Sequence, residues 1–163
     1  MVIVAVNYTP GQLRGAVGIG QETYRHWKKA LGPLRREAGH SPCFTAGDLL
    51  ATAIVKILVA DYGMRVSALS ALADGLFEAC NARSWPTLER SLLLLELAGA
   101  RVLMQSEGSG LALDGPAMVV PLRALIERLR STLLAGDGDG QEMLRFPPVA
   151  QPADPLRRRA GEA

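Results

Sequence analysis

The chain has 163 residues, enough for one domain or two small ones. Apolar residues make up 48% of the chain and charged residues 21%, a composition that excludes disorder throughout. The formal net charge of +2 is too small to indicate a nucleic-acid-binding protein by itself. Two cysteines, Cys43 and Cys80, cannot build a disulfide framework, which is typical of a protein in a reducing cytosol.

Neither a secretory signal nor a membrane span is expected. The apolar opening, residues 1–6, lacks a basic lead and is too short for the apolar region of a signal peptide. Uninterrupted apolar runs fall short of the ~18 residues that a membrane helix needs. Lys56 interrupts one such run and Glu96 another. We therefore expect a soluble, cytoplasmic protein that makes no membrane contact.

The sequence predicts an α+β fold in three parts. Residues 1–82 carry the capping signals of short helices and form the first predicted domain. Residues 83–135 carry strand patterns followed by one amphipathic helix, which predicts a small α+β accessory domain. Residues 136–163 are rich in glycine, proline and charge, so we predict a disordered tail.

Residues 1–48 hold six basic against three acidic side chains, and five of the six bases lie between 25 and 36. Such a cluster favours phosphate binding more than the total charge does.

Two short helices joined by a glycine turn are predicted near the start of the chain. Thr9, a proline and then Gln12 have the pattern of a capping box, which predicts a helix over residues 10–17. Residues 18–20 predict a tight turn, and a second helix is expected over 21–31. The residues expected to face the core from this second helix are spaced three and four apart: Tyr24, Trp27 and Leu31. This arrangement is typical of a helix-turn-helix.

The next segment predicts a loop or hairpin and then two longer helices. Residues 32–44 contain two prolines, two glycines and two arginines, which is the chemistry of turns. Thr45, with Asp48 in the first turn, predicts the start of a helix that continues to about residue 60. Ser67 is predicted to cap a fourth helix, in which Cys80 is expected to be buried and unreactive.

This order of elements resembles the MerR-type winged helix-turn-helix family over about residues 8–80. The family's usual opening, Tyr-Thr-Ile-Gly-Glu-Leu, has its counterpart in YTPGQL at residues 8–13. Its second-helix string, Thr-Leu-Arg-Tyr followed by Tyr or Trp, has its counterpart in TYRHW at residues 23–27. The family's wing ends in an aromatic residue, a serine or threonine and an Asp-Leu pair, and here these are Phe44, Thr45, Asp48 and Leu49. Gly63 stands where the family has a glycine between the two helices of its platform.

The resemblance implies that the second helix enters the major groove of double-stranded DNA, while the wing lies along the backbone or minor groove. Arg25 is the expected contact to a phosphate or a base edge. The other base-edge candidates are Gln21, Glu22 and His26. Phosphate contacts, which add affinity without sequence information, are predicted for Lys28, Lys29, Arg35 and Arg36. The helix end at Thr9 is predicted to offer backbone amides to a phosphate. Pro42 stands where family wings carry an arginine, and His40 or Ser41 is the expected substitute.

The second half of the chain predicts a small sheet and a helix. Short strands are predicted at 92–95, 101–105, 110–113 and 117–120, with the second and third joined by a turn at 107–110. Residues 1–6 are a candidate strand at an edge of this sheet. Pro121 fits the first position of an amphipathic helix that ends at about residue 135. A domain of this kind could dimerise, bind a ligand or dock a protein partner, and the sequence leaves the three open.

Catalytic and metal-binding motifs are missing from the sequence. It contains no nucleophile-elbow, zinc-protease or phosphate-loop string. The two cysteines and two histidines have no metal-ligand spacing. We therefore expect no enzymatic activity, no metal site and no cofactor.

The leading hypothesis is a bacterial-type, sequence-specific transcriptional regulator that binds double-stranded DNA as a homodimer and is nucleoid-associated when bound. A first alternative is a protein–protein interaction module, with a partner docked on residues 83–135. Pro42 in the wing and the small net charge favour this alternative. A second alternative is a DNA architectural factor of the excisionase or terminase kind, because such factors use the same winged module.

Overall fold

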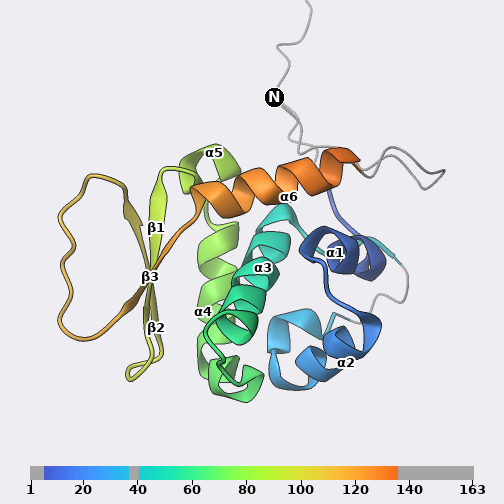
Figure 1. The fold of residues 1–163 in the computed structure, drawn as a ribbon, viewed down its shortest axis with the longest axis horizontal. Coiled ribbons are helices and arrows are strands. Elements are labelled where there is room, and N and C mark those ends of the chain that lie inside the picture. Colours follow the sequence, from blue (N-terminus) through green and yellow to red (C-terminus); the bar gives the residue numbers. More distant parts are fainter. Residues whose placement is uncertain (1–5, 37–40, 136–163) are drawn as a thin grey trace, which may run out of the picture.

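The computed structural model describes residues 6–36 and 41–135. Its helices are α1 (Pro10–Val17), α2 (Gln21–Ala30), α3 (Ala46–Ala60), α4 (Ser70–Asn81), α5 (Trp85–Leu88) and α6 (Arg123–Ala135). Two 3₁₀ turns, η1 (Gly32–Leu34) and η2 (Val66–Leu69), precede α3 and α4. The strands are β1 (Ser91–Glu96), β2 (Arg101–Ser106) and β3 (Met118–Pro121). Figure 1 shows α6 crossing above α3 and α1, with the sheet at one end of the molecule and α2 at the other. The predicted α+β fold class is confirmed.

Helix α3 is the centre of the helical part of the molecule. Nearly all of its side chains are apolar, and those from Leu49 to Val55 are buried on every side of the helix. A helix that is apolar all round has to be covered by other elements, and α1, α4 and α6 pack against it. Gly47 lets α4 approach closely, because a Cβ there would lie 2.7 Å from the carbonyl oxygen of Cys80.

The predicted pair of N-terminal helices forms as expected. The hydroxyl of Thr9 accepts a hydrogen bond from the amide of Gln12, whose side chain accepts one from the amide of Thr9, so the capping box is confirmed. Helix α1 ends at Gly18, which has a φ of 74°. Glycine adopts this left-handed conformation without steric penalty, and its amide satisfies the carbonyl of Arg14.

A buried carboxylate connects the segment before α3 to α3 and α4. Asp48 is fully buried and accepts hydrogen bonds from the amide of Thr45 (2.8 Å) and the side-chain amide of Asn81 (2.9 Å). The Arg36 guanidinium lies 2.6 Å from the same carboxylate. Arg36 also donates to the carbonyl of Cys43 (2.9 Å) and lies over the Phe44 ring. One side chain of α3 therefore holds both the segment leading into the helix and the end of α4.

The sheet is antiparallel, in the order β2-β1-β3, with β1 at its centre. Leu94 lies opposite Leu103 on one side and Val119 on the other. Because side chains alternate along a strand, Leu93 and Leu95 face the helices and Leu94 lies on the opposite face of the sheet, where it is also buried (1% exposed). β2 packs against α4. This arrangement explains why β1 is a continuous apolar run.

The two predicted domains share a single hydrophobic core. Buried side chains from α1 to α4 and from α5, β1, β3 and α6 belong to one cluster. Trp85 of α5 donates from its indole nitrogen to the carbonyl of Ala46 (3.3 Å), and α6 contacts both α1 and α3. Arg130 of α6 pairs with Glu89 and lies over the Trp85 ring. The predicted boundary between residues 82 and 83 therefore lies inside one packed body.

The predicted strand at 110–113 is wrong. Residues 107–117 form a loop, and β2 pairs with β1 across a short turn at residues 97–100. The hairpin partner of β2 is β1, which pairs with it along its whole length, so residues 110–113 become part of the connection from β2 to β3. The loop is tied to the sheet by the Gln105 side chain, which donates to the carbonyl of Gly110 at 2.7 Å.

Two predicted helix starts are also wrong. Ser67 lies inside η2, and α4 begins at Ser70 without a side-chain cap. The 3₁₀ turn carries Val66 and Leu69 into the core, and this burial outweighs the capping preference of a serine. Pro121 ends β3 opposite Leu92, and α6 begins at Arg123. A proline fits there because β3 is an edge strand.

Three predicted features fall wholly or almost wholly outside the described residues: the edge strand at 1–6, of which only Val6 is described, the tail at 136–163 and the wing tip with His40. Just before α3, Phe44 forms an isolated antiparallel bridge with Tyr8. Among the helices described, none has the length and apolar character required to cross a bilayer.

We predict that Asp48→Asn lowers the free energy of unfolding by about 2–3 kcal/mol, because it removes the charge that pairs with Arg36 and turns one acceptor into a donor. Urea denaturation followed by circular dichroism measures the change. Asp74→Asn, at an exposed position on α4, is the matched control and should change stability by less than about 0.5 kcal/mol. Equal effects of the two substitutions would contradict the central role of the buried carboxylate.

Candidate nucleic-acid interface

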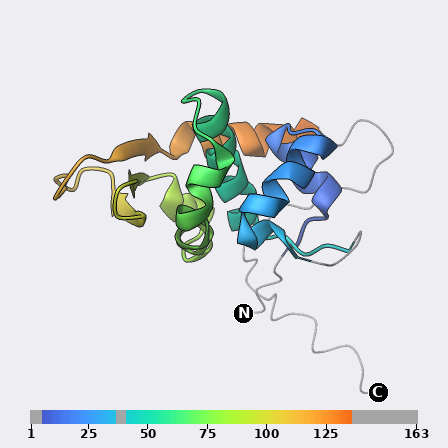
Figure 2. The ribbon, with the colours of Figure 1, turned by 90° about the horizontal axis from the view of Figure 1, so that it is seen from below.

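Helix α2 turns a polar face to solvent because its apolar side chains face the core. Tyr24 and Trp27 are buried, as predicted. Burial raises the pKa of the Tyr24 phenol, so this group stays neutral and takes no part in the charge of the surface. The exposed residues of the helix are Gln21, Glu22, Thr23, Arg25, His26 and Lys29. Figure 2 shows the molecule from the side on which α2 lies.

Among the described residues, the charged partner of Arg25 is Glu22. The Arg25 guanidinium lies 2.8 Å from the Glu22 carboxylate one turn earlier, with side chains 62% and 85% exposed. Exposed ion pairs of this kind contribute little to stability, because water and salt screen them. Arg25 can therefore leave Glu22 for a phosphate or a guanine edge at small energetic cost.

Lys28 and Lys29 come after Arg25 along the helix. The ammonium of Lys28 lies 5.7 Å from the centre of the Tyr24 ring, a cation–π contact that holds the side chain along the helix surface. Lys29 is exposed. Both lie in the last turn of α2, where a positive charge is favourable to the helix dipole.

Arg35 completes the end of α2. The sequence predicts a phosphate contact for it, but its guanidinium donates to the carbonyls of Lys28 (2.8 Å) and Lys29. These carbonyls are among the last of the helix and have no partner inside it. Because the planar guanidinium reaches both at once, Arg35 orients the end of α2 and also adds positive charge beside Lys28 and Lys29.

Arg36 and Thr9, both predicted to contact phosphate, have hydrogen-bond partners within the protein. The Arg36 guanidinium is committed to the buried Asp48 and to the Cys43 carbonyl. At Thr9, the capping box occupies the amides of Thr9 and Gln12, two of the groups that a phosphate would have met. The structure thus separates these two residues from the exposed face of α2.

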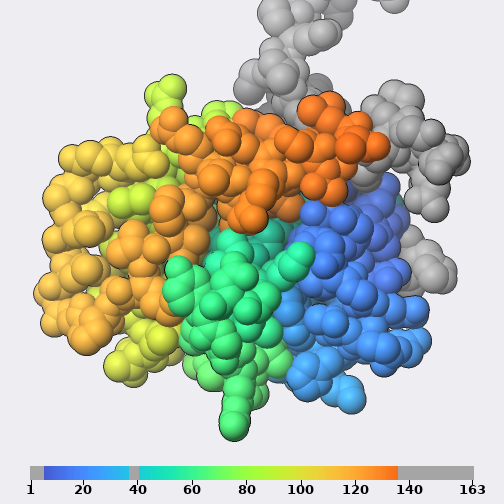
Figure 3. Space-filling view, in the orientation of Figure 1, coloured from blue at the N-terminus to red at the C-terminus, as the bar shows by residue number. Residues whose placement is uncertain are grey.

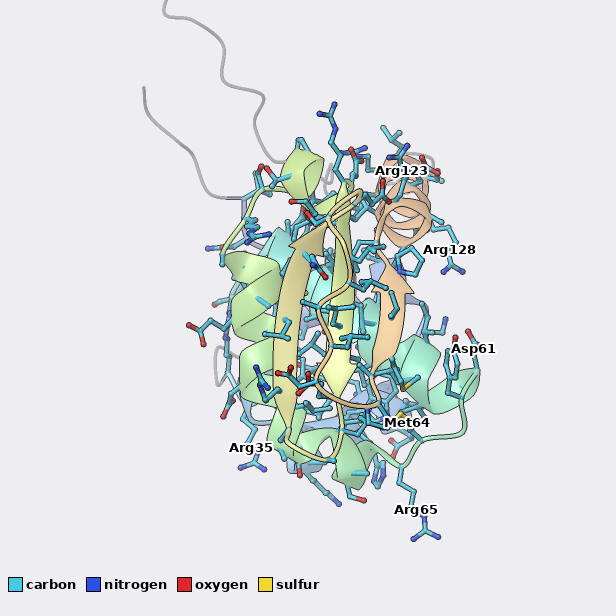
Figure 4. All side chains as sticks on the ribbon, turned by 90° about the vertical axis from the view of Figure 1, so that its left-hand side faces the viewer. Arg35, Asp61, Met64, Arg65, Arg123 and Arg128 are labelled. Atoms are coloured by element: carbon cyan, nitrogen blue, oxygen red, sulfur yellow. The ribbon has the colours of Figure 1, made fainter. Side chains whose placement is uncertain are left out.

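The exposed face of α2 continues into a groove that the sequence did not predict. His26 and Lys29 line this groove together with Arg65, which lies between α3 and η2. It has a volume of about 580 Å³, and its floor includes Trp27 and Met64. Figure 4 shows Arg65 projecting outward from the body of the molecule. The sequence shows Arg65 only as a basic residue in the turn after Gly63, and the fold is what places it beside α2.

Both cysteine thiols have a raised pKa. Burial raises the pKa of Cys43, and it raises the pKa of Cys80 to about 12, so both are protonated at neutral pH. In the part of the chain that the structure describes, no group of three or more His, Cys, Asp or Glu side chains could hold a metal ion. The chemistry that this surface offers is hydrogen bonding and positive charge.

Comparisons with protein-family models, with curated proteins and with solved structures found no match for this chain. The MerR-type resemblance stays a prediction from the sequence, and the function has to be inferred from the geometry of α2 and the groove beside it. We use the term α2 face for the surface formed by Gln21, Glu22, Arg25, His26 and Lys29 together with Arg65.

We predict that Arg35→Ala loosens the last turn of α2 and lowers the free energy of unfolding by about 0.5–1 kcal/mol. Arg35→Lys keeps the charge but cannot bridge the two carbonyls, so it should resemble Arg35→Ala. Urea denaturation gives the stability, and hydrogen exchange gives the opening of the α2 amides. Wild-type stability in Arg35→Lys would show that charge alone matters at this position.

Proposed function

We propose that this protein is a sequence-specific, DNA-binding transcriptional regulator that places α2 in the major groove of double-stranded DNA and acts as a homodimer. The observation that carries the proposal is the two-sided character of α2. Its apolar side chains lock the helix on the core, while Arg25, Gln21 and His26 project from the opposite side. A helix held rigidly by packing, with polar groups that can read base edges, suits major-groove recognition.

The charge around α2 supports DNA over a neutral partner. Among the described residues, Glu22 is the carboxylate on the α2 face, and five basic side chains lie on or beside this face: Arg25, Lys28, Lys29, Arg35 and Arg65. This local excess is larger than the +2 of the whole chain. Phosphates attract such a cluster without regard to sequence, while Arg25, Gln21 and His26 supply the discrimination.

We predict that wild-type protein selects a subset of mixed genomic DNA fragments, with an affinity that falls as salt rises, because each neutralised phosphate releases counterions. Arg25→Ala should weaken binding to the selected fragments by about 1–3 kcal/mol. Fragment selection followed by fluorescence anisotropy across a salt series measures both. Arg90→Ala, at an exposed site before β1, is the matched control and should bind like the wild type. The sequences recovered would also separate a promoter-binding regulator from an architectural factor of the excisionase or terminase kind.

Failure to bind at low salt would contradict the proposal. A second candidate function, a protein-interaction module, would then take its place. Exposed apolar side chains at the sheet end of the molecule favour it: Leu97, Leu111, Leu113 and Val119. Arg25→Glu separates the two functions in cells, because charge reversal on α2 abolishes DNA binding and leaves the sheet end intact.

The same apolar side chains are the surface that we propose for the homodimer. Val119 lies on β3 and is 39% exposed, beside a loop whose Leu111 is 51% exposed. We predict that the wild type sediments as a dimer and that Val119→Asp sediments as a monomer, because a carboxylate buried in an interface is costly. Leu134→Asp, at another exposed apolar position near the end of α6, is the control and should stay dimeric. A monomeric wild type would exclude the dimer.

A further inference from the structure

A recess lies where α1, α3 and α6 meet, away from the α2 face. Figure 3 shows it as a hollow bounded by α6 and α1, with α3 beneath. Its volume is about 420 Å³, within the range of small-molecule sites. Its apolar lining comes mainly from two helices, with Ala53 and Ile57 on α3 and Leu125 and Leu129 on α6. Crevices between packed helices are common places for ligands.

The recess is also lined by two cations. Lys56 is half-buried, and its ammonium donates to the carbonyl of Val17 at 3.0 Å. Arg128 of α6 also lines the recess, and its side chain is exposed. Among the described residues, no carboxylate lies within 4.0 Å of either cation. Asp61 lines the same recess, and Figure 4 shows it and Arg128 on the same side of the molecule.

The contact with Val17 explains only part of the role of Lys56. An ammonium at the end of α1 satisfies one terminal carbonyl and is favourable to the helix dipole. It has three donors, however, and this contact uses one of them. A half-buried cation without a carboxylate partner favours an anion in the space next to it. The lining therefore combines two cations and one carboxylate with an apolar floor.

We propose that this recess binds a small organic anion with an apolar body. The anionic head, a carboxylate or a sulfonate, accepts hydrogen bonds from Lys56 and Arg128. The hydrocarbon or aromatic body lies against Ile57, Leu125 and Leu129 and removes their surface from water. The recess shares no residue with the α2 face. The proposal that it binds an anion can therefore be tested independently of the proposal that α2 binds DNA.

The test compares two probes of the same shape that differ in charge. 8-Anilinonaphthalene-1-sulfonate carries the anionic head, and N-phenyl-1-naphthylamine lacks it. Fluorescence titration of the full chain should give one binding site for the sulfonate probe. Decanoate should compete for this site and displace the probe. Lys56→Met keeps the apolar stem and removes the ammonium, so sulfonate affinity should fall by about tenfold while the neutral probe changes by less than about twofold.

Arg128→Met provides a second, independent variant, because this exposed side chain makes no described hydrogen bond or ion pair whose loss would unfold the protein. It should lower sulfonate affinity in the same direction. Arg90→Met, at an exposed site outside the recess, is the matched control and should bind the sulfonate like the wild type. Circular dichroism checks that each variant is folded. Unchanged sulfonate binding in Arg128→Met and in folded Lys56→Met, or equal losses for the two probes, would overturn the proposal.

Discussion

The buried carboxylate of Asp48 is the interaction on which the arrangement of the N-terminal helices depends. An isolated charge inside a protein is strongly unfavourable, so its partners have to be held in place. Arg36 comes from the segment after α2, Thr45 from the start of α3 and Asn81 from the end of α4. Satisfying this single carboxylate therefore fixes where the chain returns from α2 to the core. Trp85 extends the same junction to α5 through the carbonyl of Ala46.

Around this junction the basic residues divide into two groups with different physical roles. Arg35 and Arg36 use their planar guanidinium groups inside the protein, on helix carbonyls and on Asp48. Arg25, Lys29 and Arg65 have exposed side chains whose positive charge faces solvent, with Arg25 beside the exposed carboxylate of Glu22. The first group positions α2, and the second supplies the charge that α2 presents. The proposed DNA interface is a rigid helix because the arginines next to it are committed to holding it.

Local chemistry predicts most of the helices and half of the candidate site. The Thr9 capping box and the helix start at Thr45 form as their spacing indicates, since these contacts lie within four residues of each other. The periodicity of Tyr24 and Trp27 likewise decides which side of α2 is exposed. The prediction for Arg36 as a phosphate contact overlooks its partner Asp48, because that carboxylate lies twelve residues away. The sequence does not predict that Arg65 belongs to the candidate site, because only the packing of η2 against α2 brings it beside Lys29.

The sequence by itself determined the α+β class, the bounds of α1 and α3 and the buried face of α2, because capping and periodicity act over one or two turns of chain. Tertiary structure decided the strand order, the starts of α4 and α6 and the union of both halves in one core. β1 accepts one neighbour on each edge, and which segments fill those two places depends on the competition among all of them. The recess between α1, α3 and α6 has the same origin, because its walls come from segments far apart in the chain. Such contacts are set by the balance of burial over the whole molecule, which no local pattern encodes.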